Sequence, residues 1–171
     1  MTSLSMAAAT YEALVAHLSS REEEQVAFLF TDPPAADTTL RVTELYVVPR
    51  EQFEIQSAYH VSLRDDVRGE VIRRAHELGG CLVEVHSHGG GPPVSFSVSD
   101  LLGFDEWVPH VRWRLHQRTY VALVFAEDAF DALVWDGDHN APTALVQLRV
   151  DGCVPRAPSG LTYTRLQRDQ A

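Results

Sequence analysis

The chain has very little cysteine. Its two cysteines, Cys81 and Cys153, form no Cys-x-x-Cys pair. This number excludes a disulfide framework of the kind that stabilises small secreted domains. Cys81 begins the apolar run Cys81-Leu82-Val83, so we expect it to be a buried free thiol.

Long hydrophobic runs are absent as well. No apolar run approaches the roughly 20 residues with which a helix spans a bilayer. Residues 1–10 are small and apolar but lack the basic region of a secretory signal peptide. We therefore expect a cytoplasmic protein with no membrane partner.

Basic residues are outnumbered by acidic ones. The chain has 14 Lys and Arg residues against 24 Asp and Glu residues, which gives a formal net charge of -10. Binding to a nucleic-acid backbone needs clustered basic side chains, so nucleic acid is excluded as the main partner. The balance permits a basic protein partner, but it is more typical of an ordinary soluble protein.

The length predicts the domain organisation. A chain of 171 residues can bury a substantial core within one domain. We predict a single domain over residues 1–171, with its core in about 8–150 and a weakly specified tail in 152–171.

Three segments carry signals of a helix. Apolar residues at helical spacing predict helices over about 11–18 and 67–78, and Gly79-Gly80 follows the second as a stop signal. A Ser-x-x-Asp sequence at Ser97 is typical of a helix start. We expect Pro109 to interrupt that third helix.

Short apolar runs predict the strands, at 25–31, 40–48, 81–88, 120–125, 132–135 and 145–150. Residues 32–37 are predicted as a turn, and 49–64 as an extended connection or an irregular strand. Because consecutive strands are often close in sequence, we predict an α/β (α+β) fold: a mixed, largely antiparallel sheet flanked by helices.

The most informative segment is Val85-His86-Ser87-His88. Side chains alternate between the two faces of a strand, so the two histidines point the same way. Asp100 can return to this pair because a glycine- and proline-rich loop, 89–93, lies between them. Two imidazoles and one carboxylate, with a fourth position open, form the ligand set of a hydrolytic zinc site. We predict one zinc ion per chain, held by His86, His88 and Asp100.

A hydrolytic zinc also needs a base to take a proton from water. Glu22, Glu23 and Glu24 stand just before a predicted strand, Glu44 lies within another, and Glu84 shares the face of the histidines. Chemistry alone does not choose among these five glutamates.

These residues together resemble the JAMM (MPN-type) zinc metalloproteases. The signature of that family is an upstream Glu, then His-x-His, seven residues, Ser, two residues and Asp. Here eight residues separate His88 from Ser97, and the extra one falls in the glycine loop, where an insertion is easily absorbed. Ser97 keeps the Ser-x-x-Asp relation, and Ser95 and Ser99 are alternatives.

The resemblance implies roles for two further residues. The catalytic glutamate of the family starts the strand after the first helix, which selects Glu24, with Glu23 as its nearest rival. Glu24 would take the proton of the water and later donate it to the leaving amine, and Ser97 would stabilise the oxyanion. An MPN/JAB-like (cytidine-deaminase-like) architecture is implied over roughly residues 8–136.

The resemblance also implies a prokaryotic, stand-alone enzyme. Relatives cleave isopeptide or peptide bonds after the C-terminal glycine of ubiquitin or ubiquitin-like proteins. We therefore expect deconjugation or precursor processing of a ubiquitin-like protein, within a bacterial ubiquitin-like conjugation (antiphage) operon. One alternative is a zinc peptidase that releases a sulfur-carrier protein or a small peptide conjugate. Another is a catalytically silent MPN-like scaffold that binds a partner protein, although such scaffolds usually lack metal ligands.

Two segments are candidates for holding the tail of a substrate, residues 50–63 and 103–118. An extended tail is usually bound by strand addition. In the second segment we expect Trp107 and Trp113 to pack in the core or over the sheet, and His110 and His116 to be surface or packing residues and not metal ligands. The substrate-binding residues and the oligomeric state remain open at this point.

Overall fold

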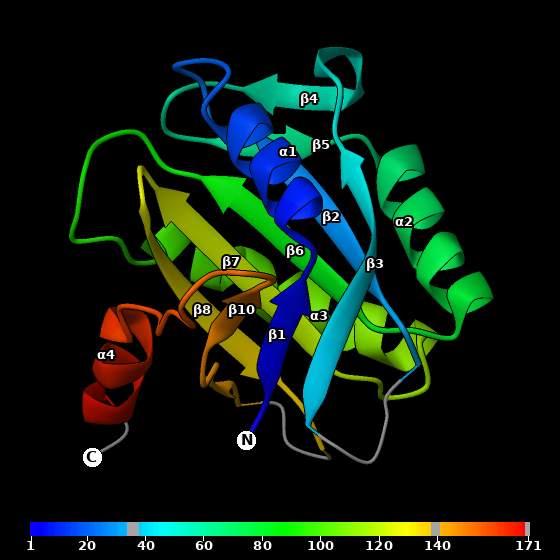
Figure 1. Ribbon diagram of the computed structural model, residues 1–171. Helices are drawn as coiled ribbons and strands as arrows, with labels where there is room; N and C mark the ends of the chain where they lie inside the picture. The colour runs from blue at the N-terminus through cyan, green and yellow to red at the C-terminus, as the bar shows by residue number, and fades with distance from the viewer. Residues whose placement is uncertain (34–37, 138–140, 170–171) are drawn as a thin grey trace.

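The computed structural model describes residues 1–33, 38–137 and 141–169. Over these residues the main sheet has eight strands in the order β10-β1-β3-β2-β6-β7-β8-β9 (Figure 1). Its strands are β1 (Ser3–Met6), β2 (Val26–Thr31), β3 (Thr39–Val47), β6 (Leu82–Ser87), β7 (Tyr120–Ala126), β8 (Ala129–Trp135), β9 (Thr143–Ala144) and β10 (Leu148–Val150). A separate hairpin pairs β4 (Phe53–Gln56) with β5 (Val61–Leu63). The helices are α1 (Ala8–Leu18), α2 (Asp65–Leu78), α3 (Val98–Arg114) and α4 (Leu161–Asp169).

The main sheet is mixed, as predicted. β2 runs antiparallel to β3 and β6, and β8 runs antiparallel to β7 and β9. β6 and β7 are parallel, so a crossover must join them, and α3 forms it. The start of α3 therefore lies near the C-terminal end of β6, where the two histidines are.

Both faces of the sheet are covered, and alternate residues of one strand pack on opposite faces. In β2, Phe28 belongs to the core that includes Val71 of α2 and Val108 of α3. Its neighbour Leu29 belongs to the core that includes Leu14 of α1. Figure 1 shows α1 in front of the sheet and α3 behind it. Burial on both faces explains why the central strands are continuous apolar runs.

The junction between α2 and β6 depends on two glycines. α2 ends at Gly79 in the left-handed conformation, with φ of 69°, which glycine adopts without strain. A Cβ on Gly80 would lie 1.7 Å from the carbonyl oxygen of Thr31, so no side chain fits there. Cys81 follows as a buried free thiol, as predicted.

The predicted interruption of the third helix at Pro109 is wrong, because α3 continues to Arg114. Proline has no N–H and removes one helical hydrogen bond. Val108 and Val111 are nevertheless buried beside it. Packing against the core therefore outweighs the local loss.

Several elements were not predicted from the sequence. β1 lies between β3 and β10, and the tail contains α4. Residues 49–64, predicted as an extended connection or an irregular strand, contain the two strands of the β4–β5 hairpin. Of the turn predicted at 32–37, residues 34–37 lie outside the described residues. None of the helices in the described part of the chain is long and apolar enough to cross a membrane.

Candidate metal centre

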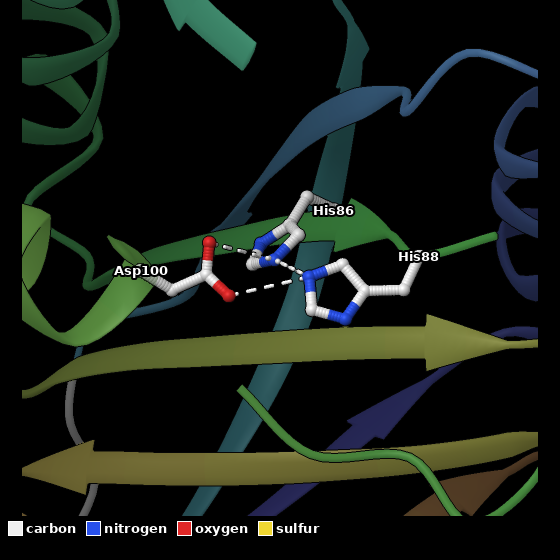
Figure 2. A group of neighbouring side chains, drawn as sticks. All are labelled: His86, His88 and Asp100. Atoms are coloured by element: carbon white, nitrogen blue, oxygen red, sulfur yellow. Dashed lines mark hydrogen bonds and ion pairs between the residues drawn. The ribbon is translucent and has the colours of Figure 1, made fainter. Parts of the chain in front are cut away.

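His86 and His88 converge at the end of β6. Their Nε2 atoms are 3.2 Å apart, and Figure 2 shows both rings turned toward Asp100. The backbone holds this end of the strand, because the N–H of His88 donates to the carbonyl oxygen of Phe125 at 2.8 Å. The shared face predicted from the His-x-His spacing is therefore formed.

Asp100 reaches the same point from the first turn of α3. Its Oδ1 lies 3.5 Å from Nε2 of His86, and its Oδ2 lies 3.2 Å from Nε2 of His88 (Figure 2). The N–H of Ser97 donates to Asp100 Oδ2 at 2.7 Å, and the N–H of Asp100 donates to Ser97 Oγ at 3.1 Å. This capping box orients the carboxylate toward the histidines.

Glu24 enters the site through the register of β2 and β6. Val26 pairs with His86 in an antiparallel ladder, so Glu24, two residues earlier, lies opposite His88, two residues later. Its Oε1 is 3.8 Å from Nε2 of His88, and its side chain is 7% exposed. The N–H of Glu24 donates to the carbonyl oxygen of Ser57 at 2.9 Å, which ties it to the β4–β5 hairpin.

The rival glutamates have other partners. Glu23 stands 4.0 Å from Arg50, and Glu22 is exposed. Glu44 accepts a hydrogen bond from Arg74 at 2.9 Å. Glu84 lines the same cavity as Glu24 and His86, but its carboxylate accepts a hydrogen bond from the hydroxyl of Tyr120 at 2.6 Å. Of the five candidates, Glu24 is the one whose carboxylate forms an ion-pair contact with His88.

Ser97 caps α3 next to the site, but it contacts the metal donors only through Asp100. Its Oγ accepts the capping hydrogen bond from Asp100, which leaves its O–H able to donate to another group. Ser99, one of the two alternatives, lines a cavity together with Glu24, His86 and Asp100. The oxyanion role of Ser97 stays a prediction.

The electrostatics of the donors favour an anionic Asp100 and a protonated His86. Burial raises the pKa of Asp100, but hydrogen bonds from His86 and His88 outweigh it and hold that pKa far below its usual range. Burial lowers the pKa of His86, and the hydrogen bond with Asp100 raises it to a net value above 6.5. Without a metal, the cluster therefore shares protons that metal binding must displace.

Glu24 has the electrostatic setting of an acid–base group. Burial raises its pKa above the ordinary 4.5, and the nearby His86 and His88 lower it by less. A raised carboxyl pKa brings proton affinity closer to neutral pH, where a general base and acid works best.

The two imidazole nitrogens have the spacing of metal ligands. Donor atoms 2.0–2.1 Å from a zinc ion at tetrahedral angles stand about 3.3 Å apart, and the two Nε2 atoms here are 3.2 Å apart. Each of them faces a different oxygen of the Asp100 carboxylate, with His86 3.5 Å from Oδ1 and His88 3.2 Å from Oδ2. His86, His88 and Asp100 can therefore hold a metal ion, and three protein ligands would leave a fourth position for water or substrate.

A second layer of polar groups adjoins the donors. Trp107 Nε1 donates to the hydroxyl of Tyr120 at 3.0 Å, and that hydroxyl donates to Glu84. Burial and the nearby Glu84 raise the pKa of Tyr120 well above its ordinary value, so it remains a donor. Arg68 lines the cavity that Glu24, His86 and Asp100 also line. No sequence motif marked Arg68 or Tyr120, because only the packing of α2 and β7 brings them here.

Both predicted substrate segments contribute residues to the cavity beside the metal donors. Tyr59 and His60, between the hairpin strands, line the cavity beside the metal donors, as does Trp107. Trp107 is buried, as expected, but the packing prediction for Trp113 is wrong, since 66% of its surface is exposed. His116 lies against His76, with ring centres 5.8 Å apart, and does not join the metal donors.

Fold and site together define a class of protein: a mixed α/β domain with a candidate hydrolytic metal centre where a strand end meets a helix start. The family described as prokaryotic homologs of the JAB domain matches residues 7–136, so the chain belongs to this family. The resemblance to JAMM/MPN-type proteins is thereby confirmed. Glu24, the His-x-His pair and Asp100 lie inside the matched range, and α4 lies outside it.

Comparison with individual proteins adds support for the fold. No curated protein matches the chain. The solution structure of protein DSY2949 from Desulfitobacterium hafniense matches with a TM-score of 0.55 and 18% identity, over 86% of this chain and 94% of that one. At this identity the match supports the architecture alone.

Proposed function

We propose that this protein is a zinc-dependent peptidase or isopeptidase that cleaves after the C-terminal glycine of a ubiquitin-like protein. The observation that carries the proposal is the buried carboxylate of Glu24, 3.8 Å from a His-His-Asp donor cluster. Metal binding alone would need only the cluster. A scaffold that only binds a partner needs no buried carboxyl group with a raised pKa beside these donors.

Each residue then has a chemical task. A zinc ion held by His86, His88 and Asp100 would act as a Lewis acid and lower the pKa of water. Glu24 takes the proton of the attacking water and later gives it to the leaving amine. Ser97 donates a hydrogen bond from its hydroxyl group to the oxyanion, which lowers the barrier by roughly 3–4 kcal/mol.

The β4–β5 hairpin is the proposed binding site for the substrate tail. An extended chain can pair with a strand edge, which provides affinity through backbone hydrogen bonds. This hairpin is separate from the main sheet, and it contacts the base through the Glu24–Ser57 hydrogen bond. Ile55 and Tyr59 are exposed on it and offer apolar contacts to a bound tail.

A second candidate function is cleavage of a small peptide or amino-acid conjugate, including the release of a sulfur-carrier protein. The cavity beside the metal donors has a volume of about 180 Å³ and is lined by both Arg68 and Glu84. A cation and an anion in one small cavity suit the carboxylate and ammonium groups of an amino acid.

The test of the base uses a ubiquitin-like protein fused through its C-terminal glycine to a reporter. Glutamine cannot accept the proton, so Glu24→Gln should lower the cleavage rate by about 100-fold or more while the metal content stays that of the wild type. Glu23→Gln is the matched control and should cleave normally.

The opposite pattern, with Glu23→Gln inactive and Glu24→Gln active, would show that the base is Glu23 and not Glu24. A metal-loaded wild type that cleaves no fusion but cleaves an amino-acid conjugate of the same carrier would favour the second candidate.

A further inference from the structure

Helix α4 and the residues before it are bonded to the loop that leads into α3. The N–H of Phe96 donates to Thr162 Oγ1 at 2.9 Å, and Arg165 Nη2 donates to the carbonyl oxygen of Phe96 at 2.8 Å. Ser159 Oγ donates to the carbonyl oxygen of Val94 at 2.8 Å. Both the N–H and the carbonyl oxygen of Phe96 are therefore held by α4, and Phe96 immediately precedes Ser97, the N-cap of α3.

The start of α4 is itself fixed to the sheet by a buried acid. Asp131 of β8 is fully buried. Its Oδ1 accepts the N–H of Gly160 at 3.0 Å, and its Oδ2 accepts the N–H of Thr162 at 2.9 Å. A carboxylate that accepts the first free N–H groups of a helix stabilises the helix start. Tyr163 and Leu166 add apolar packing against the core, so α4 is a rigid support.

The supported loop touches the metal donors. Phe96 is fully buried, with its ring centre 5.7 Å from that of His86 and 5.2 Å from that of Phe104 in α3. The next residue is Ser97, the cap that orients Asp100. A displacement of Phe96 would therefore move one ligand through ring packing and another through the helix start.

We propose that α4 is a clamp that sets the geometry of the metal centre, with Thr162, Arg165 and Asp131 as positioning residues. In this view the metal affinity of the domain depends on a helix that lies beyond residues 7–136, the range matched to the family. Outer groups that orient metal ligands change affinity by about 10–100-fold when they are removed. The catalytic consequence rests on the proposed function, but the effect on metal affinity does not.

The experiment compares two threonines of α4. Thr162→Val keeps the shape of the buried side chain and removes the acceptor of the Phe96 N–H. Thr164→Val is the matched control, because Thr164 is exposed and its Oγ1 donates to the carbonyl oxygen of Gly160 at the start of α4 and not to the loop before α3. The dissociation constants for Zn2+ and Co2+ are measured by chelator competition, together with the Co2+ absorption spectrum and the unfolding midpoint.

We expect Thr162→Val to weaken metal binding by about 10-fold or more and to alter the Co2+ spectrum, while Thr162→Ser restores both. Thr164→Val should match the wild type. Arg165→Gln removes the hydrogen bond to the carbonyl oxygen of Phe96, and Arg168→Gln is its control. Both arginines are exposed, so these two variants are less prone to unfold than a variant of the buried Thr162. Wild-type affinity and spectrum in both Thr162→Val and Arg165→Gln would overturn the proposal.

Activity separates this proposal from the proposed function. If the wild type cleaves the fusion, Thr162→Val should lower kcat at saturating metal and leave KM nearly unchanged. If the wild type binds metal but cleaves nothing, the proposed function fails, and the metal affinities still decide whether the clamp exists.

Discussion

At the scale of single residues, the site depends on side chains that have more than one contact. Asp100 accepts a hydrogen bond from the backbone of Ser97 and also faces both histidines. Its low pKa keeps it an anion at neutral pH. Ser97 likewise caps α3 and is the predicted donor to the oxyanion, so a simple deletion of its side chain would mix the two effects.

Ser97→Gly can separate them. At an N-cap position glycine costs only a few tenths of a kcal/mol relative to serine, so the unfolding free energy should change little. Loss of an oxyanion donor should lower kcat by about 100-fold or more. Fusion cleavage and urea unfolding are the measurements, and Ser97→Thr, which keeps both roles, is the control. A fully active Ser97→Gly would remove Ser97 from the catalytic group.

At the scale of elements, the β2–β6 pairing determines which acid reaches the metal donors. A shift of one residue in this ladder would turn the opposite set of side chains toward the site. The register is held where α2 enters β6, because Gly80 passes against the backbone of Thr31 and Cys81 N–H donates to Thr31 Oγ1 at 3.0 Å. The close backbone contact at Gly80 therefore supports the site from the far end of the strand.

Two glycine substitutions test this junction. Gly80→Ala places a Cβ against a carbonyl oxygen and should destabilise the fold by at least about 2 kcal/mol. Gly69→Ala, in the interior of α2, meets no heavy atom within 4 Å and should stabilise it by about 1 kcal/mol. Chemical denaturation measures both. Equal stability of the two variants would contradict the close approach at Gly80.

The sequence predicts those elements whose signal is local. The helix at 67–78, the strand at 81–88 and the Ser-x-x-Asp cap can each be read from periodicity or spacing. The continuation of α3 through Pro109 cannot, because it depends on burial of Val108 and Val111 against distant strands. α4 is equally hidden, because it is held by Phe96 and Asp131, far away along the chain. The hairpin pairs nearby residues, but its strands are short and their register shifts, which obscures the alternating pattern of a strand.

At the scale of the whole molecule, the sheet is assembled from both ends of the chain. β1 lies between β3 and β10, with parallel partners on both sides, and Figure 1 shows these strands next to each other. On the other side of the sheet, α4 packs on β8 and supports the loop before α3. Segments near the two ends of the sequence are thus part of the framework that surrounds the site.

The family signature could predict the donors from residues 86–100, but the support by α4 could not be predicted, because no spacing rule relates residue 162 to residue 96.

The central claim is that His86, His88 and Asp100 form one metal centre with Glu24 as an acid–base group outside the ligand set. The most direct test is the metal content of purified protein, measured by mass spectrometry after dialysis. The account predicts about one zinc per chain in the wild type and in Glu24→Gln, and almost none in His88→Ala. Wild-type protein without zinc, or a zinc content that His88→Ala leaves unchanged, would contradict it.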